Sequence, residues 1–418
     1  MNKRITSFAY ILALSLIVVP GSIFGTLARG MMVAVSVAAI GGLAATGWRV
    51  RWVEIRWALL GALYVIAGLF SALYSPRLEL GLLDAGRQMF IFVFAFSSLI
   101  VFRNSEFSEQ FRRMLAFPAL IGAFTLIFGF VAILGAPTPD KLSELASFKY
   151  EMDARFGVNP NPLSFAIVLL FVLSWQFAGK QRSWWFLGYA LIVVISIVLS
   201  GARTSLVIIP VALFLVRMLN RPPSTVGLIF LVLAAIAIFI VGMLSVGDLT
   251  LADAILAVSE LTTGRSDLWG AALAKFVERP LLGWGANTWD LDLSSYLSIY
   301  STDVDRFDLL ESGGFHNAYL TQLAEKGIFG LTVELLILGY LLRSSLRLYW
   351  MRASLQGEEK RIASIAPVWA TLLVIRGFSE VGGLLGYANA GVDFIAYAGA
   401  GLILAAYGRI SSGYSVRK

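Results

Sequence analysis

The run Leu115-Ala-Phe-Pro-Ala-Leu-Ile-Gly-Ala-Phe-Thr-Leu-Ile-Phe-Gly-Phe-Val-Ala-Ile-Leu-Gly135 contains no charged side chain. A helix needs about 17–25 apolar residues to cross roughly 30 Å of hydrocarbon, so this run predicts a membrane-spanning helix. Similar runs recur along the whole chain. We count about twelve of them, at roughly 8–26, 31–47, 57–74, 88–102, 115–135, 161–178, 184–200, 203–219, 226–246, 328–346, 362–379 and 391–408.

The composition leads to the same fold class. Hydrophobic residues make up 58% of the 418 residues and charged residues 14%, and the mean hydropathy is +0.79. Soluble domains have about 45–50% apolar and about 25% charged residues. We therefore predict an all-α integral membrane protein. Lys3 and Arg4 before the first run would also fit a signal peptide, but with so many runs behind it we expect an uncleaved helix.

The basic residues are divided unevenly between the two sets of connections. One set, together with both termini, holds about 20 of the 33 basic residues and about 5 of the 26 acidic ones, and the positive-inside rule places that side in the cytoplasm. Both termini are then cytoplasmic. The net charge of +7 follows from this distribution and gives no evidence for nucleic-acid binding.

The chain divides into three regions by polarity. Residues 1–246 hold transmembrane helices 1–9, residues 247–315 form a large outward, periplasmic loop, and residues 316–418 hold helices 10–12. Within the loop, a helix is expected from Asp267 to Pro280. Its apolar face carries Trp269, Leu273, Phe276 and Val277, while Lys275 and Glu278 lie off that face. The pattern fits a helix on the outer membrane surface or, equally, one packed on the protein's own loop.

Polar residues gather at the outer ends of the predicted spans, whose centres look free of charge. They are Arg87, Arg155, Arg203, Arg265, His316, Arg376 and Glu380. A proton-coupled transporter more often places ionisable groups near the bilayer midplane. The distribution instead favours a site at the outer membrane boundary that receives its substrate from the lipid.

Three residues of this set suggest a chemistry. His316 is the only histidine, and its imidazole can accept a proton near neutral pH. Arg203 lies in a tight outward turn, and Arg265 precedes a helix start, where phosphate oxygens bind well. Two arginines in one pocket would neutralise a diphosphate without a metal. The alternatives are a lipid-facing Arg203, a loop ion pair of Arg265 with Asp267 or Glu260, and an ordinary surface histidine.

Four motifs in this order resemble the O-antigen ligase/polymerase superfamily of bacterial inner-membrane proteins. They are Arg203 in its outer turn, Thr263-Gly-Arg-Ser-Asp-Leu-Trp, Arg279-Pro-Leu-Leu-Gly-Trp-Gly, and His316-Asn followed after nine residues by Gly327-Ile-Phe-Gly-Leu. The resemblance runs from about 155 to 335. Gly327 and Gly330 would let the helix that carries His316 bend or pack closely.

The resemblance implies a membrane glycosyltransferase of lipopolysaccharide or exopolysaccharide assembly. Its donor is an undecaprenyl-diphosphate-linked glycan, and no metal or other cofactor is expected. His316 is then the general base toward the acceptor hydroxyl, and Arg203 and Arg265 bind the donor diphosphate. Asn317, Arg87, Arg376 and Arg155 are further candidates for substrate binding. We expect inversion at the anomeric carbon because the acceptor attacks opposite the diphosphate.

Several readings stay open at this point. Transfer to lipid A-core, a ligase reaction, is the first expectation, and transfer to a growing glycan, a polymerase reaction, uses the same donor. A flippase for the lipid-linked glycan is the alternative of another class. Asp290-Leu-Asp292 and Asp303-Val-Asp305 have the form of a metal site, but the loop is rich in aspartate and chance pairs are expected.

Overall fold

The computed structural model describes residues 50–134, 160–174, 184–199, 268–300, 315–378 and 390–414, together with single residues at 33, 34, 36, 37, 41, 205 and 211. These residues are helical or lie in turns and contain no β-strand, which confirms the all-α class. The helices are α3 (Trp52–Leu73), α4 (Leu78–Val101), α5 (Ser105–Met114), α6 (Ala116–Leu134), α8 (Pro160–Ser174), α9 (Trp184–Leu199), α13 (Leu293–Tyr300), α15 (Ala318–Met351), the short 3-10 helix η4 (Arg352–Ser354), α16 (Gly357–Gly377) and α17 (Ala390–Tyr414).

Most of the predicted spans fall on these helices. Within the part of the chain that the structure describes, 5 helices are long and apolar enough to cross a membrane. Helices α8 and α9 contain shorter apolar segments. The runs 8–26 and 226–246 lie outside the described residues, as do all but single residues of 31–47 and 203–219. The total of about twelve spans and the sidedness of the termini therefore stay predictions.

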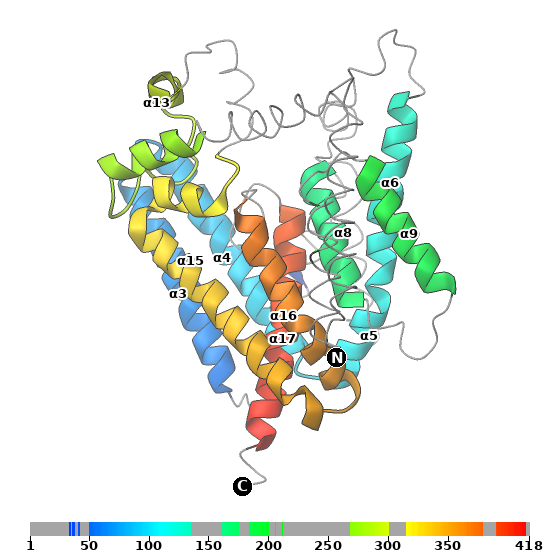
Figure 1. The fold of residues 1–418 in the computed structure, drawn as a ribbon. Helices are drawn as coiled ribbons and strands as arrows, with labels where there is room; N and C mark the ends of the chain where they lie inside the picture. Colours follow the sequence, from blue (N-terminus) through cyan, green and yellow to red (C-terminus); the bar gives the residue numbers. More distant parts are fainter. Residues whose placement is uncertain are drawn as a thin grey trace, which may run out of the picture.

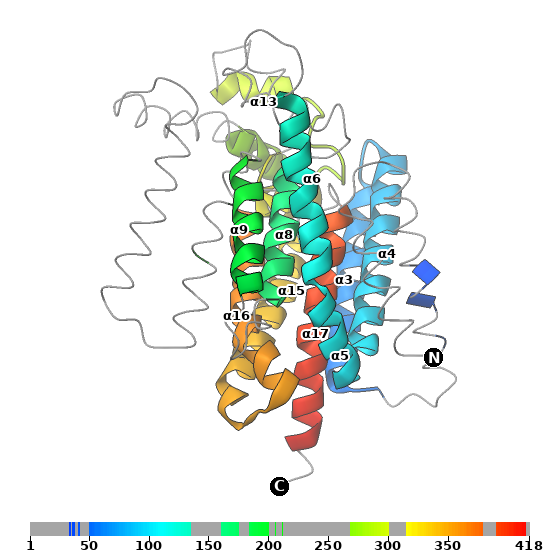
Figure 2. The ribbon, with the colours of Figure 1, turned by 90° about the vertical axis from the view of Figure 1, so that its right-hand side faces the viewer.

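The bundle has two groups of helices, one of α3, α4 and α15 and the other of α6, α8 and α9. Helices α16 and α17 lie between the two groups (Figures 1 and 2). Helices α3, α4 and α15 contact one another, and α6 contacts α8 and α9. Helix α17 lies between the groups and touches α4, α8, α15 and α16. Its alanines Ala396, Ala400 and Ala406 are fully buried, since small side chains let membrane helices approach closely.

Ion pairs between helices lie at one end of the bundle. At the end where α17 finishes, Arg112 of α5 makes a buried ion pair with Glu358 of α16, with nitrogen–oxygen distances of 2.5 and 3.0 Å. Arg409 pairs with Glu359 at 3.1 Å at the same end. The polar segment 268–300 lies at the opposite end. The described connections that were predicted to be cytoplasmic, namely those before α3, between α4 and α6 and between α15 and α16, share the end of the bundle where α17 finishes (Figure 1).

Two helices begin earlier than the sequence analysis predicted. Helix α4 starts at Leu78 rather than near 88, and α15 starts at Ala318 rather than near 328. The prediction stopped at charged residues because a lone charge in hydrocarbon is costly. The helices continue because Asp84 and Lys326 face each other inside the protein, 3.6 Å apart. Two acidic residues within the predicted spans, Glu334 and Asp393, are also buried in the bundle.

The loop helix predicted from Asp267 is helical over 268–278. Leu268, Ala271 and Ala272 form its buried side and pack with Leu293 and Leu297 of α13. Lys275 was expected on the exposed side but is only 1% exposed. Leu273 and Val277 are exposed, at 46% and 73%. The helix thus packs on its own loop through a face other than the predicted one, and its contact with a membrane surface stays a prediction.

Helix α15 is broken at Gly327, where φ is 63° and ψ is −165°. Only glycine adopts this backbone conformation readily. In an unbroken helix the carbonyls of Ala324 and Glu325 would accept from the residues four positions later. Here Trp284 N–H donates to Ala324 O at 3.0 Å, and Gly285 N–H donates to Glu325 O at 2.8 Å.

The same loop accepts hydrogen bonds from the other side of the break. Ile328 N–H donates to Pro280 O at 2.8 Å, and Phe329 N–H donates to Leu281 O at 3.4 Å. A Cβ on Gly283 would lie 2.4 Å from Glu325 O, so this backbone pairing requires glycine there. Two motifs that are far apart in the sequence, 279–285 and 327–330, thus form one backbone-paired unit.

We expect Gly327→Ala to lower the free energy of unfolding by about 3 kcal/mol or more, because it adds backbone strain and a clash. The added Cβ would lie 2.4 Å from Leu281 carbonyl carbon and oxygen. Gly339→Ala is the matched control on the same helix, since its Cβ would meet nothing within 4 Å. It should be neutral or stabilise by up to about 1 kcal/mol. Thermal unfolding of the purified variants in detergent distinguishes them, and equal midpoints would contradict the role of the break.

Candidate functional site

His316 lies at the beginning of α15, in a segment that is held on both sides. Its backbone is left-handed, with φ at 49°, a region in which histidine, asparagine and aspartate are the commoner non-glycine residues. The preceding carbonyl of Phe315 accepts from the indole N–H of Trp269 at 3.1 Å. His316 itself is half-buried. The imidazole is therefore carried by backbone of defined direction, close to the loop helix 268–278.

Asn317 caps α15 and joins it to α16. Its Oδ1 accepts from Leu320 N–H at 3.1 Å, which satisfies one of the free donors of the helix start. Its Nδ2 donates to Phe378 O at 3.3 Å. Two residues further on, the Tyr319 hydroxyl donates to Val374 O at 2.8 Å. Both contacts hold the start of α15 against the end of α16.

Residues 318–326, between the cap and the break, are called the arm below. On its buried side, Gln322 donates to the Tyr64 hydroxyl of α3 at 3.1 Å. Lys326, four residues later on the same face, lies 3.6 Å from Asp84 Oδ2 of α4. The Ser71 hydroxyl of α3 donates to Glu325 O at 2.6 Å. The outer end of the arm, next to Asn317, therefore contacts α16. Its inner end, next to Gly327, contacts α3 and α4.

Arg376, one of the predicted binding residues, lies near the end of α16. Its guanidinium is 4.9 Å from the centre of the Phe165 ring of α8. The side chain is 1% exposed. Asn317 reaches Phe378, two residues further along. The structure thus brings the surroundings of Arg376 and His316 together, at the end of the bundle that carries segment 268–300.

The loop that supports the break is held by two cations of segment 268–300. Lys275 Nζ donates to the carbonyls of Thr288 at 2.7 Å and Trp289 at 3.2 Å, and also to that of Leu291. Burial lowers the pKa of Lys275 to about 8, although nearby carboxylates such as Glu325 oppose this effect. Arg279 donates to Tyr74 O at 3.1 Å at the end of α3. These contacts hold the loop in place against α15.

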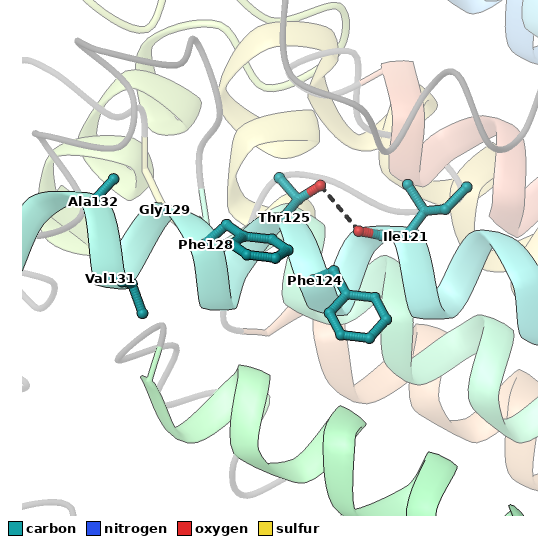
Figure 3. A pocket seen from close by; sticks show the side chains of 7 residues that line it. All are labelled: Ile121, Phe124, Thr125, Phe128, Gly129, Val131 and Ala132. Carbon is teal, nitrogen blue, oxygen red and sulfur yellow. Dashed lines mark hydrogen bonds between the residues drawn. The ribbon is translucent and has the colours of Figure 1, made fainter.

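An open apolar groove of about 660 Å³ lies on α6 (Figure 3). Its lining residues all come from that helix: Ile121, Phe124, Thr125, Phe128, Gly129, Val131 and Ala132. The Thr125 hydroxyl donates to Ile121 O at 3.0 Å. The groove therefore offers apolar contact and no proton-transfer group, so it is not a candidate for the chemistry.

The remaining predicted site residues have different placements. Arg87 is exposed on α4. Arg155, Arg203 and Arg265 lie outside the described residues, as does the pair Asp303 and Asp305. Asp290 is described and pairs with Arg77 at 2.9 Å, which leaves it engaged in a contact between segment 268–300 and α4.

Sequence reasoning missed the residues that position the arm. Asp84, Gln322 and Lys326 were placed outside the spans, so their polarity carried no signal. The spacing of Gln322 and Lys326, four residues apart, would have put them on one helical face if the helix had been predicted to begin at Ala318. Lys275 had no signal at all, because a single lysine on a loop helix is most often exposed.

The family comparison agrees with the motifs. Residues 188–334 match the family model described as O-antigen ligase, which confirms the resemblance. The matched segment includes Arg203, Arg265, the loop helix 268–278, His316 and the broken part of α15. No curated protein matches the chain.

Asn317 supplies a cap and a link to α16, and two substitutions separate these roles. Asn317→Ala removes both and should lower the free energy of unfolding by about 1–2 kcal/mol. Asn317→Asp keeps the cap acceptor but has no amide donor for Phe378 O, so its loss should be smaller. Thermal unfolding measures both variants. Equal losses would show that the link to α16, rather than the cap, stabilises this end of α15.

Proposed function

We propose that the protein transfers a glycan from undecaprenyl diphosphate to lipid A-core, because residues 188–334 match the family model described as O-antigen ligase. The reaction takes place at the periplasmic face of the bacterial inner membrane. It needs no metal and inverts the anomeric carbon. A polymerase, which transfers the same donor to a growing glycan, is the alternative within the family.

The observation that carries this proposal is the placement of His316. It is held between the loop helix and α16 by the contacts of Phe315 and Asn317. The start of α15, two residues after His316, lies at the end of the bundle opposite the connections α4–α5 and α15–α16 (Figure 1). If those connections are cytoplasmic, as the positive-inside rule expects, His316 faces the periplasm. A lipid-linked donor would reach this end from the outer leaflet.

The proposed chemistry uses His316 as the general base. Its imidazole takes the proton of the acceptor hydroxyl while the hydroxyl oxygen forms a bond to C1 of the donor sugar. The bond between C1 and the phosphate oxygen breaks, and undecaprenyl diphosphate leaves with the electron pair. Base catalysis of this kind contributes about 10²–10⁴-fold. The half-buried position of His316 leaves it accessible to a hydroxyl.

Arginines are proposed to hold the diphosphate. Arg265 comes three residues before the helix 268–278, and Trp269 of that helix contacts Phe315. Because Arg265 is close in sequence to this helix, we expect its guanidinium to reach the surroundings of His316. Guanidinium groups bind phosphate oxygens in pairs and stabilise charge on the leaving group. Arg203 shares this role, and Arg376 at the end of α16 is the described candidate to join it.

The other predicted binding residues have smaller roles in this arrangement. Asn317 uses its oxygen and one N–H within the protein, so only its second N–H is left for a substrate. Arg87 is exposed on α4 and is better placed for lipid headgroups than for the arm. Arg155 stays a candidate by position in the sequence alone.

We expect His316→Asn to lower the rate of transfer by about 10²–10⁴-fold. Asparagine tolerates the left-handed backbone at this position, so the fold should persist while the base is removed. The measurement is glycan transfer by the purified protein from undecaprenyl-diphosphate-linked glycan to lipid A-core, with thermal unfolding as the control for folding. Activity within a few-fold of the original would overturn the assignment of the base.

Deletion of the gene in its host distinguishes ligase from polymerase. If the protein is a ligase, the deletion strain should keep long chains on undecaprenyl diphosphate and leave lipid A-core bare. The two kinds of glycan are separated by size. A polymerase predicts single repeat units on core with the longer ladder lost, and loss of a secreted polymer alone would make the acceptor an exopolysaccharide. A flippase would instead move labelled lipid-linked glycan across liposomes without a new glycosidic bond. Unchanged glycans would overturn the transferase proposal.

A further inference from the structure

A buried ion pair lies at the inner end of the arm, directly before the break at Gly327. Lys326 Nζ is 3.6 Å from Asp84 Oδ2, and both side chains are 0% exposed. The Lys326 ammonium also lies 4.9 Å from the centre of the Tyr64 ring, and Gln88 donates to Asp84. The pair therefore joins the arm to α4, with α3 alongside.

Such a pair is a poor source of stability. Removing two charges from water costs about as much as their attraction returns, and apolar residues of similar size are often equally stabilising. Its effect is geometric instead, because moving Lys326 away from Asp84 would separate opposite charges in a medium of low dielectric constant. The pair thus favours one position of the inner end of the arm.

The length of the arm makes this position matter for His316. Residues 318–326 extend over roughly 14 Å at 1.5 Å per residue, so a tilt of about 5° moves the outer end by about 1 Å. A misplacement of about 1 Å can lower a rate by about 10²-fold. The contacts of Asn317 and Tyr319 with α16 hold the outer end, and the ion pair fixes the other.

We propose that Asp84 and Lys326 are positioning residues, whose ion pair sets the direction of the arm and hence the location of the His316 imidazole. They do not touch the substrates. This inference rests on the proposed role of His316 as the base. It assigns a function to two buried charged side chains of α4 and α15 that the transfer reaction itself does not use.

The main test is the double variant Asp84→Asn/Lys326→Met, which removes both charges of the pair together. Asparagine keeps an acceptor for Gln88. We expect a thermal unfolding midpoint close to the original, a kcat lowered by about 10–100-fold, and a KM for the donor that changes little. The matched control, Glu109→Gln/Arg113→Met, removes an exposed ion pair of α5 and should leave kcat unchanged. A stable double variant with the original kcat would overturn the proposal.

A second readout reports the placement of His316 without activity. The chain has 1 histidine, so nitrogen-15 labelling of histidine, with a purification tag that lacks histidine, gives a single imidazole signal in NMR. The signal should shift or broaden in the double variant and stay unchanged in the α5 control. An unchanged signal in the double variant would overturn the proposal, even if His316→Asn had shown that His316 is not the base.

Asp84→Glu covers the case in which the double variant does not fold. It keeps the charge and lengthens the side chain by one methylene, so the pair should persist with the arm displaced. We expect a smaller loss of kcat than in the double variant, together with a shifted imidazole signal. If kcat and the imidazole signal both keep their original values, the length of the side chain at position 84 does not set the direction of the arm.

Discussion

The backbone pairing between loop 280–285 and the break at Gly327 is the constraint on which the rest of this region depends. A membrane offers no water to backbone groups, so a helix can be interrupted there only where other protein groups take up its hydrogen bonds. Here the exchange is reciprocal, with Trp284 and Gly285 donating into α15 and Ile328 and Phe329 donating out of it. The break divides α15 into an arm and a long spanning portion.

The side chains around the break are arranged to keep that unit in place. Lys275 binds three carbonyls of the segment 288–291 that follows the loop, and Arg279 joins the start of the loop to the end of α3. On the other side, Ser71 reaches Glu325 O and Asp84 meets Lys326. Each buried cation thus has an oxygen partner, as burial of charge requires. The same contacts join the loop, α3 and α4 to the arm.

This arrangement explains why a transferase could use a bent helix. A base must be held within a fraction of an ångström of its proton while the donor approaches from the lipid. The arm supplies a short rigid element whose outer end carries His316 and whose two ends contact different helices. The spanning portion of α15 stays free to pack with α16 and α17. Under the proposed function, the arm would hold the catalytic base while the spanning portion packs with the other membrane helices.

The sequence by itself determined the all-α membrane class, most span positions from 52 to 134 and beyond 315, the outward end of the bundle as an expectation, and His316 with its family motifs. Hydrophobic runs and motif spacing are local, so they can be read from one chain. Only the tertiary structure decided that α4 and α15 begin near Leu78 and Ala318, that Lys275 is buried, and that motifs 279–285 and 327–330 pair. Those features depend on partners far away in the sequence, because a buried charge or a broken helix is tolerated only where another segment satisfies it.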